Sequence, residues 1–161
     1  MSSGQKVRYD IDLATYEGAS DSADIESRTI VPSDREALAH LMLDAYVGTI
    51  DYEGETITEA FDAVDEWFAG SSLLSHSFVA ATDARPVSAV LAMWIDDAPL
   101  IGIVMTHPDY KNVGYGRAVT HRALKSMASE GHDRVVLYIT DGNTPSERMF
   151  SALGAKPTTT N

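Results

Sequence analysis

The chain has 161 residues, of which 44% are hydrophobic and 22% are charged, and its formal net charge is −12. This composition is typical of a folded globular domain and excludes a largely disordered chain. The acidic excess argues against nucleic acid as the main partner, because no basic surface could dominate the field. The absence of cysteine excludes disulfides and thiolate chemistry. With neither an apolar leader-like segment nor a long apolar run, we expect a single cytoplasmic domain over residues 1–161 and no membrane association.

The N-terminal region predicts a strand followed by a loop. Apolar and polar residues alternate over residues 7–13, which is the period of a half-buried strand. Small and polar residues at 18–22 predict a turn or loop, and residues 25–31 then predict a second strand that ends at Pro32. Residues 1–26 are therefore expected to form an extra N-terminal strand and loop.

Two amphipathic helices are predicted next. Ser33 and Glu36 have the S-x-x-E spacing of a capping box, in which each side chain satisfies a free backbone N–H at a helix start. Thr56 and Glu59 repeat this spacing, and Gly70 is a stop signal for the second helix. The expected inward stripes are Leu38, Leu41, Met42, Ala45 and Tyr46 in the first helix, and Ile57, Phe61, Val64 and Phe68 in the second.

The rest of the chain carries alternating β and α signals. Three short β runs at residues 78–82, 87–95 and 100–106 predict an antiparallel meander. Residues 134–140 are apolar nearly throughout and predict a strand buried on both faces. Residues 144–147 have the spacing of a further capping box, so a last short helix is expected there. Its expected inward-facing residues are Met149, Phe150 and Leu153.

A glycine-bearing loop follows the last strand of the meander. The apolar run ends at Met105 and leads into a polar turn. Gly114 and Gly116 follow, and then a helical pattern begins. Two positions without Cβ let an anion approach the main chain, where N–H groups face the positive end of a helix. The sequence therefore predicts a phosphate or pyrophosphate site, with a plain tight turn before a helix as the alternative.

Two motifs carry a resemblance to a known family. Residues 111–116, KNVGYG, resemble the R/Q-x-x-G-x-G/A pyrophosphate loop of the GCN5-related N-acetyltransferases, with Lys111 where Arg or Gln is usual. Residues 137–154 are similar to the family's strand, turn and helix with the pattern N-x-x-A-x-x-L-Y-x-x-x-G-F, in which Asn143 is the first residue. The predicted order of elements is also similar to that of the whole acetyltransferase domain.

The resemblance implies an α+β fold with α/β/α-like layers, in which helices flank a mixed, mostly antiparallel central sheet. The family's fourth and fifth strands splay apart, and they correspond here to residues 100–106 and 134–140. Family members usually continue with one or two further strands, whereas residues 155–161 are few and include Pro157. We therefore expect a truncated C-terminal sheet edge, with residues 7–13 covering sheet surface elsewhere and a second subunit closing the edge as a homodimer.

The resemblance also implies acetyl-CoA as the cosubstrate. Its pantetheine would extend the strand at residues 104–106, and its pyrophosphate would take backbone N–H groups from residues 111–117. Asn143 would hold the distal pantetheine or, alternatively, only shape the turn before the last helix. The implied cofactor-binding residues are Val104, Met105, Thr106, Lys111, Asn112, Val113, Gly114, Tyr115, Gly116, Arg117, Asn143 and Phe150. The five histidines have no metal-ligand spacing, so no metal is expected.

The implied reaction transfers an acetyl group to a primary amine of a small molecule or protein by direct attack on the thioester. The oxyanion would meet a backbone N–H near Val104 or Met105. Many relatives protonate the thiolate with a Tyr at the place of Phe150, so solvent or another hydroxyl must serve here. Tyr138 and His107 are the catalytic candidates. The alternatives are plain packing for Tyr138 and no chemical role for His107.

The acceptor stays open. The loop between the first two helices holds Asp51, Glu53 and Glu55, which would attract a cationic amine, and a solvated acidic loop is the alternative. The competing function is a non-catalytic acyl-CoA-binding or regulatory module, which Phe150 permits. A nucleotide-binding α/β domain is disfavoured, because neither G-x-x-x-x-G-K-[ST] nor G-x-G-x-x-G is present.

Overall fold

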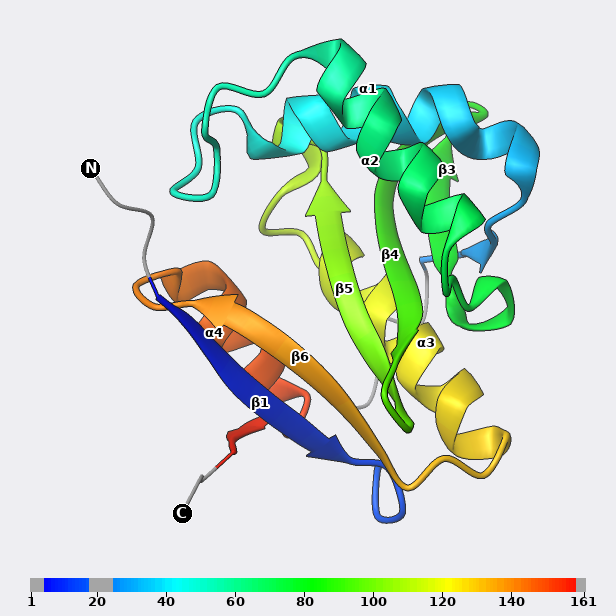
Figure 1. The fold of residues 1–161 in the computed structure, drawn as a ribbon, viewed down its shortest axis with the longest axis vertical. Coiled ribbons are helices and arrows are strands. Elements are labelled where there is room, and N and C mark those ends of the chain that lie inside the picture. Colours follow the sequence, from blue (N-terminus) through cyan, green and yellow to red (C-terminus); the bar gives the residue numbers. More distant parts are fainter. Residues whose placement is uncertain (1–4, 18–24, 159–161) are drawn as a thin grey trace.

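The computed structural model describes residues 5–17 and 25–158, so the loop expected at residues 18–22 lies outside the described part. A seven-stranded sheet runs through the described residues in the order β2-β3-β4-β5-β6-β1-β7 (Figure 1). The strands are β1 (Lys6–Asp12), β2 (Arg28–Thr29), β3 (Phe78–Thr82), β4 (Arg85–Ile95), β5 (Ala98–Thr106), β6 (Arg134–Thr140) and β7 (Lys156–Pro157). The α-helices are α1 (Arg35–Tyr46), α2 (Ile57–Ala69), α3 (Tyr115–Ser129) and α4 (Thr144–Ala152). The 3-10 helices are η1 (Pro32–Asp34), η2 (Leu74–His76) and η3 (Pro108–Tyr110).

The two central strands β5 and β6 diverge. They form the parallel pair in a sheet whose other neighbours are antiparallel. Among the described residues they pair only at Leu100 with Val136 and at Ile101 with Leu137. Figure 1 shows the gap between them widening towards the tips of both arrows. The expected mixed, mostly antiparallel sheet with a splay between these strands is confirmed.

The strand β4 explains why helices cover both faces of the sheet. Ala89 and Leu91 belong to a core cluster with α1 and α2, while Val90 and Ala92 belong to a cluster with α3 and α4. All four side chains are fully buried. Because side chains alternate along a strand, each face of β4 receives its own helical layer. None of the described helices has the length and apolar character needed to cross a bilayer.

The strand β1 lies beside β6, on the side away from β5. The two strands pair antiparallel over the whole of β1, and β7 then pairs with β1 (Figure 1). The expectation that residues 7–13 cover sheet surface elsewhere is therefore wrong. Their alternation fits the free edge of β6 and buries Ile11 in the cluster beneath α3 and α4. A second subunit at this edge and the single-domain organisation stay predictions.

Two strands differ from their expected form. The strand β6 is not buried on both faces, since Tyr138 is 42% exposed. The physical reason is that α1 and α2 cover β4 and β5, and no β6 residue belongs to their cluster. The strand β2 is confined to Arg28–Thr29, because the chain already turns into η1 at Pro32.

Helix starts follow local side-chain chemistry, although not always at the expected residue. The capping box of Thr56 and Glu59 is confirmed, with N–H···O distances of 3.2 and 3.0 Å in its two directions. The box of Ser33 and Glu36 is wrong, because Ser33 lies inside η1. The carboxylate of Asp34 instead accepts a backbone N–H at 2.9 Å, and α1 begins one residue later.

The start of the last helix and the buried face of α2 also differ from the residues expected from the sequence. Asn143 caps α4, since its Oδ1 accepts the N–H of Ser146 at 3.3 Å. The box expected at residues 144–147 is therefore wrong, because Thr144 is already helical. The fully buried residues of α2 are Ala60, Val64 and Trp67, whereas Ile57, Phe61 and Phe68 pack partly buried at its flanks.

Candidate functional site

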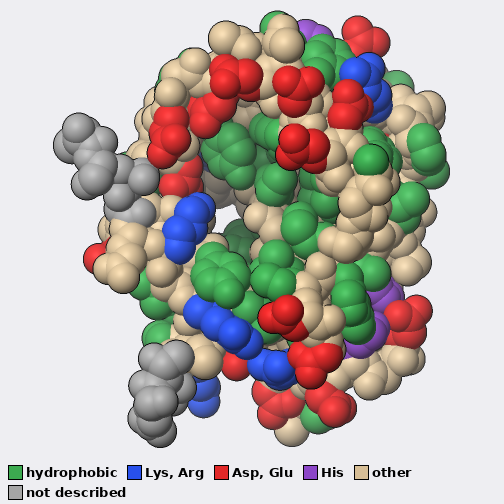
Figure 2. Space-filling view, viewed as in Figure 1, with side chains coloured by type: hydrophobic (Ala, Val, Ile, Leu, Met, Phe, Trp, Pro, Cys, Tyr) green, Lys and Arg blue, Asp and Glu red, His purple; other side chains and the backbone are tan. Residues whose placement is uncertain are grey.

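The divergence of β5 and β6 opens a cleft of about 590 Å³. Its walls are the second half of β5, the uncovered face of β6, the loop between α1 and α2, the glycine loop and the start of α4. Figure 2 shows the hollow in the centre of this face, with acidic side chains gathered above it over the α1–α2 region. The structure brings every expected cofactor-binding residue to this cleft except Val113, which is 63% exposed.

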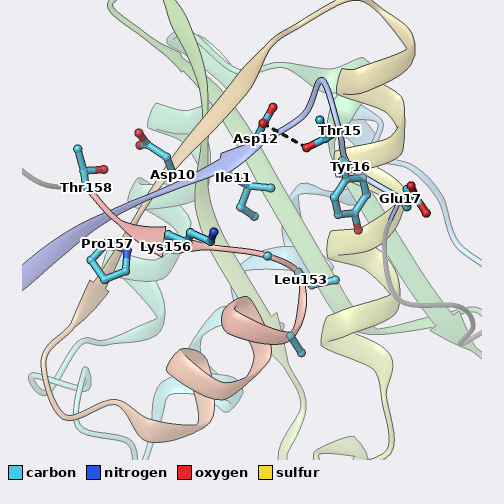
Figure 3. Close-up of a pocket in the computed structure, with 12 residues that line it drawn as sticks. Asp10, Ile11, Asp12, Thr15, Tyr16, Glu17, Leu153, Lys156, Pro157 and Thr158 are labelled. Atoms are coloured by element: carbon cyan, nitrogen blue, oxygen red, sulfur yellow. Dashed lines mark hydrogen bonds between the residues drawn. The ribbon is translucent and has the colours of Figure 1, made fainter.

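A second hollow of about 670 Å³ lies between β1 and the segment after α4 (Figure 3). Of the acidic residues that line it, Asp10, Asp12 and Glu17, Asp12 already accepts hydrogen bonds from the N–H of Ala14 at 2.9 Å and from the hydroxyl of Thr15 at 3.1 Å. None of the sequence-predicted site residues lines this hollow. The cleft between β5 and β6 is therefore the candidate site.

The two glycines of the loop have different physical roles. Gly114 caps α3 with a φ of +100°, a left-handed conformation that other residues adopt only with strain. Gly116 leaves space, since a Cβ there would lie 3.2 Å from Oγ1 of Thr106. The first N–H groups of α3 have no acceptor within the helix, so they can bind an anion in the cleft. The Lys111 ammonium donates to the carbonyl of Ala45 at 3.4 Å and so ties this loop to the end of α1.

The edge of β5 that faces the cleft carries a second set of backbone groups. Beyond Ile101, β6 no longer pairs with β5, and residues 102–106 line the cleft. On its other side β5 pairs with β4 along its length, with one register shift that leaves Gly102 without a partner in the ladder. A strand with one free edge can bind an extended polar chain through N–H and C=O groups. The free edge and the glycine loop therefore form one continuous binding surface.

Three side chains close one end of the cleft. Asp51, in the loop between α1 and α2, accepts a 2.7 Å hydrogen bond from the hydroxyl of Thr140. The same carboxylate accepts a 3.2 Å hydrogen bond from the amide of Asn143. Asn143 thus caps α4 and joins the loop at the same time. The sequence predicts a site role for Asn143 but not its hydrogen bond to Asp51, because the two residues lie far apart in the chain.

Two tyrosines offer hydroxyl groups to the cleft. Tyr138 lines it from β6 and is accessible. Tyr46 lines it from the end of α1. Its pKa is raised to about 12, mainly by burial and to a smaller extent by the negative charges of Asp51 and Glu55. Tyr46 therefore stays protonated at neutral pH and can donate a hydrogen bond. This role was not predicted from the sequence, because Tyr46 falls on the apolar stripe of α1.

Phe150 and His107 differ in their relation to the cleft. Phe150 lines it and is 6% exposed. His107 is not among the lining residues. Its Nδ1 accepts the N–H of Asp109 at 3.1 Å, which caps η3, and its Nε2 lies 3.4 Å from the guanidinium of Arg85. A catalytic role for His107 stays a prediction.

Only one acidic residue of the loop between α1 and α2 lines the cleft. Of its three acids, Asp51 lines the cleft and Glu53 and Glu55 do not. On α2, Asp65 forms an ion pair with Arg35. The acidic charge that an acceptor would meet inside the cleft is therefore that of Asp51.

Comparisons with known proteins agree with this arrangement. A family model described as FR47-like protein matches residues 82–161, which contain β5, the glycine loop and α4. The fold superposes on a GCN5-related N-acetyltransferase from Sphaerobacter thermophilus with a TM-score of 0.73 at 16% identity. That match covers 95% of this chain and 48% of the other. The chain belongs to the GCN5-related N-acetyltransferase family.

Two further matches are to proteins named as acetyltransferases. A mycothiol acetyltransferase from Thermobispora bispora is 35% identical over 60 residues, which are 36% of this chain and 20% of that protein. The chain thus matches about a fifth of this curated relative's length. A PaiA N-acetyltransferase from Thermoplasma acidophilum, solved in complex with coenzyme A, has a TM-score of 0.62 at 17% identity. This match covers 80% of this chain and 87% of the other.

Proposed function

We propose that this acetyltransferase-family protein transfers an acetyl group from acetyl-CoA to a primary amine of a small molecule or protein. The observation that carries the proposal is the meeting of two main-chain surfaces in one cleft, the free edge of β5 and the start of α3. An acyl-CoA has two parts that match them, an extended amide-containing arm and a diphosphate. The coenzyme A complex of a structural relative supports this choice of cosubstrate.

In this proposal the pantetheine lies along Val104, Met105 and Thr106 and pairs with their backbone groups as an added strand. The pyrophosphate meets the N–H groups at the start of α3, where the helix dipole contributes about 0.3–1 kcal/mol or somewhat more when partly buried. Lys111 and Arg117 also line the cleft and add positive charge to it. No metal is needed in this scheme.

The reaction requires an unprotonated amine, a hydrogen-bond donor to the oxyanion and a proton for the departing thiolate. An unprotonated amine attacks the thioester carbonyl, forming the C–N bond and an oxyanion that a β5 backbone N–H near Val104 or Met105 stabilises. Collapse of the intermediate breaks the C–S bond and releases a thiolate, while the new ammonium group loses a proton. Phe150 cannot supply a proton to the thiolate, so Tyr138 is the proposed donor. Tyr46 is a second candidate, because it stays protonated and lines the same cleft.

The acceptor is proposed to be an amine with positive charge near its reactive nitrogen. Asp51 lines the cleft, and Figure 2 shows acidic side chains above the hollow. These charges raise the local concentration of a cationic substrate. A cytoplasmic location and a homodimer are further predictions, and sedimentation of the purified chain tests the second.

The competing function is a non-catalytic acyl-CoA-binding or regulatory module. The observation that favours it is Phe150, a buried side chain without a proton to donate. Both functions predict binding of acetyl-CoA, so binding alone does not separate them.

Turnover separates the two functions. Released coenzyme A thiol would be measured with a thiol-reactive dye against a panel of polyamines, aminoglycosides, amino acids and peptides. The chain has no cysteine, so the protein itself gives no background in this assay. Acceptor-dependent thiol release supports the enzyme, whereas tight calorimetric binding of acetyl-CoA without release on any amine supports the module. Absence of binding heat with coenzyme A would overturn both.

A further inference from the structure

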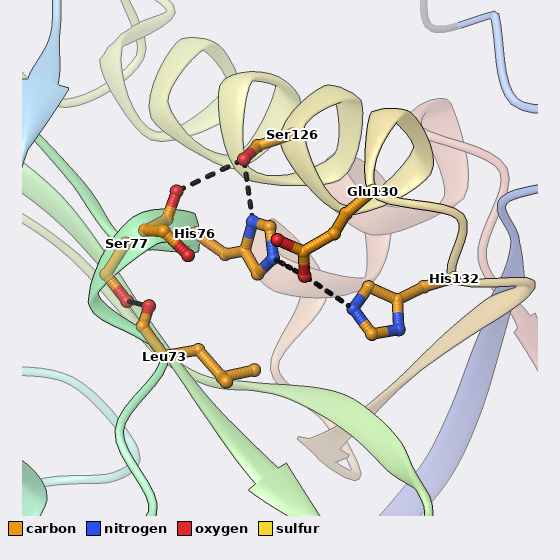
Figure 4. A network of polar contacts seen from close by, with 7 residues as sticks. Leu73, His76, Ser77, Ser126, Glu130 and His132 are labelled. Atoms are coloured by element: carbon orange, nitrogen blue, oxygen red, sulfur yellow. Dashed lines mark hydrogen bonds and ion pairs between the residues drawn. The ribbon is translucent and has the colours of Figure 1, made fainter.

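Two histidines and a glutamate converge at the end of α3 that lies away from the cleft. His76 comes from η2, Glu130 follows α3, and His132 begins the loop to β6 (Figure 4). Nε2 of His76 lies 2.9 Å, and Nε2 of His132 3.1 Å, from the same Oε1 of Glu130. One ligand atom from each residue lies within 4.8 Å of the other two. The helix between this cluster and the glycine loop has 15 residues, so it separates them by about 22 Å.

The hydrogen bonds around His76 fix which of its nitrogens carries a proton. Nδ1 of His76 lies 2.6 Å from Oγ of Ser126, and this hydroxyl donates to the carbonyl of Ser75 at 3.1 Å (Figure 4). A hydroxyl has one hydrogen and a carbonyl can only accept. The assignment that satisfies both contacts makes Nδ1–H the donor to Ser126. In this tautomer Nε2 carries no hydrogen, and its lone pair faces Oε1 of Glu130.

A lone pair and a carboxylate oxygen 2.9 Å apart repel each other unless a cation, either a proton or a metal ion, lies between them. A proton could join one such pair. Here a third atom that could bind a metal, Nε2 of His132, contacts the same oxygen of Glu130. Two imidazole nitrogens and a carboxylate oxygen within 4.8 Å of one another are an arrangement that can coordinate a metal ion.

We propose that His76, Glu130 and His132 form a site for a divalent transition metal of the zinc class. Two imidazoles and a carboxylate are ligands that zinc prefers, and an N–H from the other nitrogen of a ligating histidine to a fixed acceptor, here Ser126, is its usual support. Ligand atoms of a tetrahedral zinc lie about 3.4 Å apart, so the cluster needs only small side-chain movements. His76 is 2% exposed and Glu130 58%, which leaves one side open for a water ligand.

The sequence shows no metal-ligand spacing at this site. Glu130 and His132 are two residues apart beyond the end of a helix, and His76 lies more than fifty residues earlier. The fold alone brings η2 against α3. A metal here would fasten η2, α3 and the start of β6 to one another, on the opposite side of the molecule from the chemistry.

A neighbouring tryptophan makes the site observable. The ring of Trp94 lies 5.6 Å from that of His132, whereas the other tryptophan, Trp67, is a buried residue of α2. A paramagnetic ion at the cluster should therefore quench Trp94. Trp94→Phe should remove that signal and leave metal binding unchanged.

The experiment titrates Co²⁺ into the full chain without an affinity tag, after treatment with a chelator. We expect one equivalent to bind, with the visible absorption of four-coordinate Co²⁺, quenching of Trp94 and displacement by Zn²⁺. Glu130→Gln and His132→Gln should lose this signal, and Ser126→Ala should weaken binding about 10–100-fold. His40→Gln is the matched control, since it removes an exposed histidine of α1 and should bind as the parent chain does.

Thermal unfolding gives an independent readout. Zn²⁺ should raise the midpoint of the parent chain and of His40→Gln, because it binds the folded state, but not that of Glu130→Gln. Glu130 is exposed, so its Gln variant should fold normally. Absence of Co²⁺ binding in the parent chain, or equal binding by Glu130→Gln and His132→Gln, would overturn the proposal and leave a proton as the cation of this cluster.

Discussion

The carboxylate of Asp51 and the hydroxyl of Thr140 meet at 2.7 Å across the end of the cleft. Asp51 lies in the loop that covers the cleft, and Thr140 is the last residue of β6. Thr140 is 4% exposed, so its hydroxyl has little access to water. This hydrogen bond therefore couples the covering loop to the sheet.

The Asp51–Thr140 contact should be measurable as stability. We expect Asp51→Ala to lower the free energy of unfolding by about 1–3 kcal/mol, because it leaves the buried Thr140 hydroxyl without its acceptor. Asp51→Asn keeps an acceptor and should cost less. Glu53→Ala, in the same loop but exposed, is the control and should stay within about 0.5 kcal/mol. Chemical denaturation checks this, and equal values for Asp51→Ala and Glu53→Ala would contradict it.

The glycine loop should be essential for cofactor binding but not for folding. We expect Gly114→Val and Gly116→Val to abolish calorimetric binding of coenzyme A, the first through backbone strain and the second through crowding against Thr106. Far-UV circular dichroism should remain that of the parent chain. Gly154→Val has a similar φ of +97° at the end of α4 and should retain binding. Unchanged affinity in both loop variants would remove the phosphate assignment.

Tyr46 predicts a loss of stability at alkaline pH. The pKa of Tyr46 is about 12 in the folded protein, whereas an unperturbed tyrosine has a pKa of 10.0. The folded state therefore holds this proton more tightly than the unfolded state does. The resulting stabilisation is fully present below pH 10 and is lost as the pH rises towards 12. We expect Tyr46→Phe to reduce this alkaline loss by about 1–3 kcal/mol. Tyr16, raised to about 12 mainly by burial, acts in the same direction, so Tyr16→Phe is the comparison in pH-dependent denaturation.

Tyr138 should affect the reaction and leave the fold intact. If it protonates the thiolate, Tyr138→Phe should lower kcat by about 100-fold or more, while KM for acetyl-CoA changes little. Because the ring is accessible, unfolding should shift by no more than about 0.5 kcal/mol. Tyr9→Phe, on β1 and outside the cleft, is the control in the thiol-release assay. A kcat equal to that of the control would exclude Tyr138 from the chemistry.

Local patterns in the sequence were enough for several features. The alternating strand β1, the capping box of Thr56 and Glu59, and the loop with Gly114 and Gly116 all appear where they were expected. Each depends on a few neighbouring residues, because strand period, helix capping and left-handed φ are short-range properties. These features, with their order along the chain, also carried the family resemblance.

Contacts between distant residues were decided only by the tertiary structure. The sequence placed β1 on the wrong part of the sheet, missed Tyr46 as a cleft residue, and gave no sign that Asp51 meets Thr140 or that His76 meets Glu130. The residues of each contacting pair are separated by more than fifty positions in the chain. Tyr46 faces a cleft that exists only because β5 and β6 diverge. Short-range periodicity fixes which face of an element is apolar. Which polar side chains then converge depends on the path of the whole chain, and that path is set by packing.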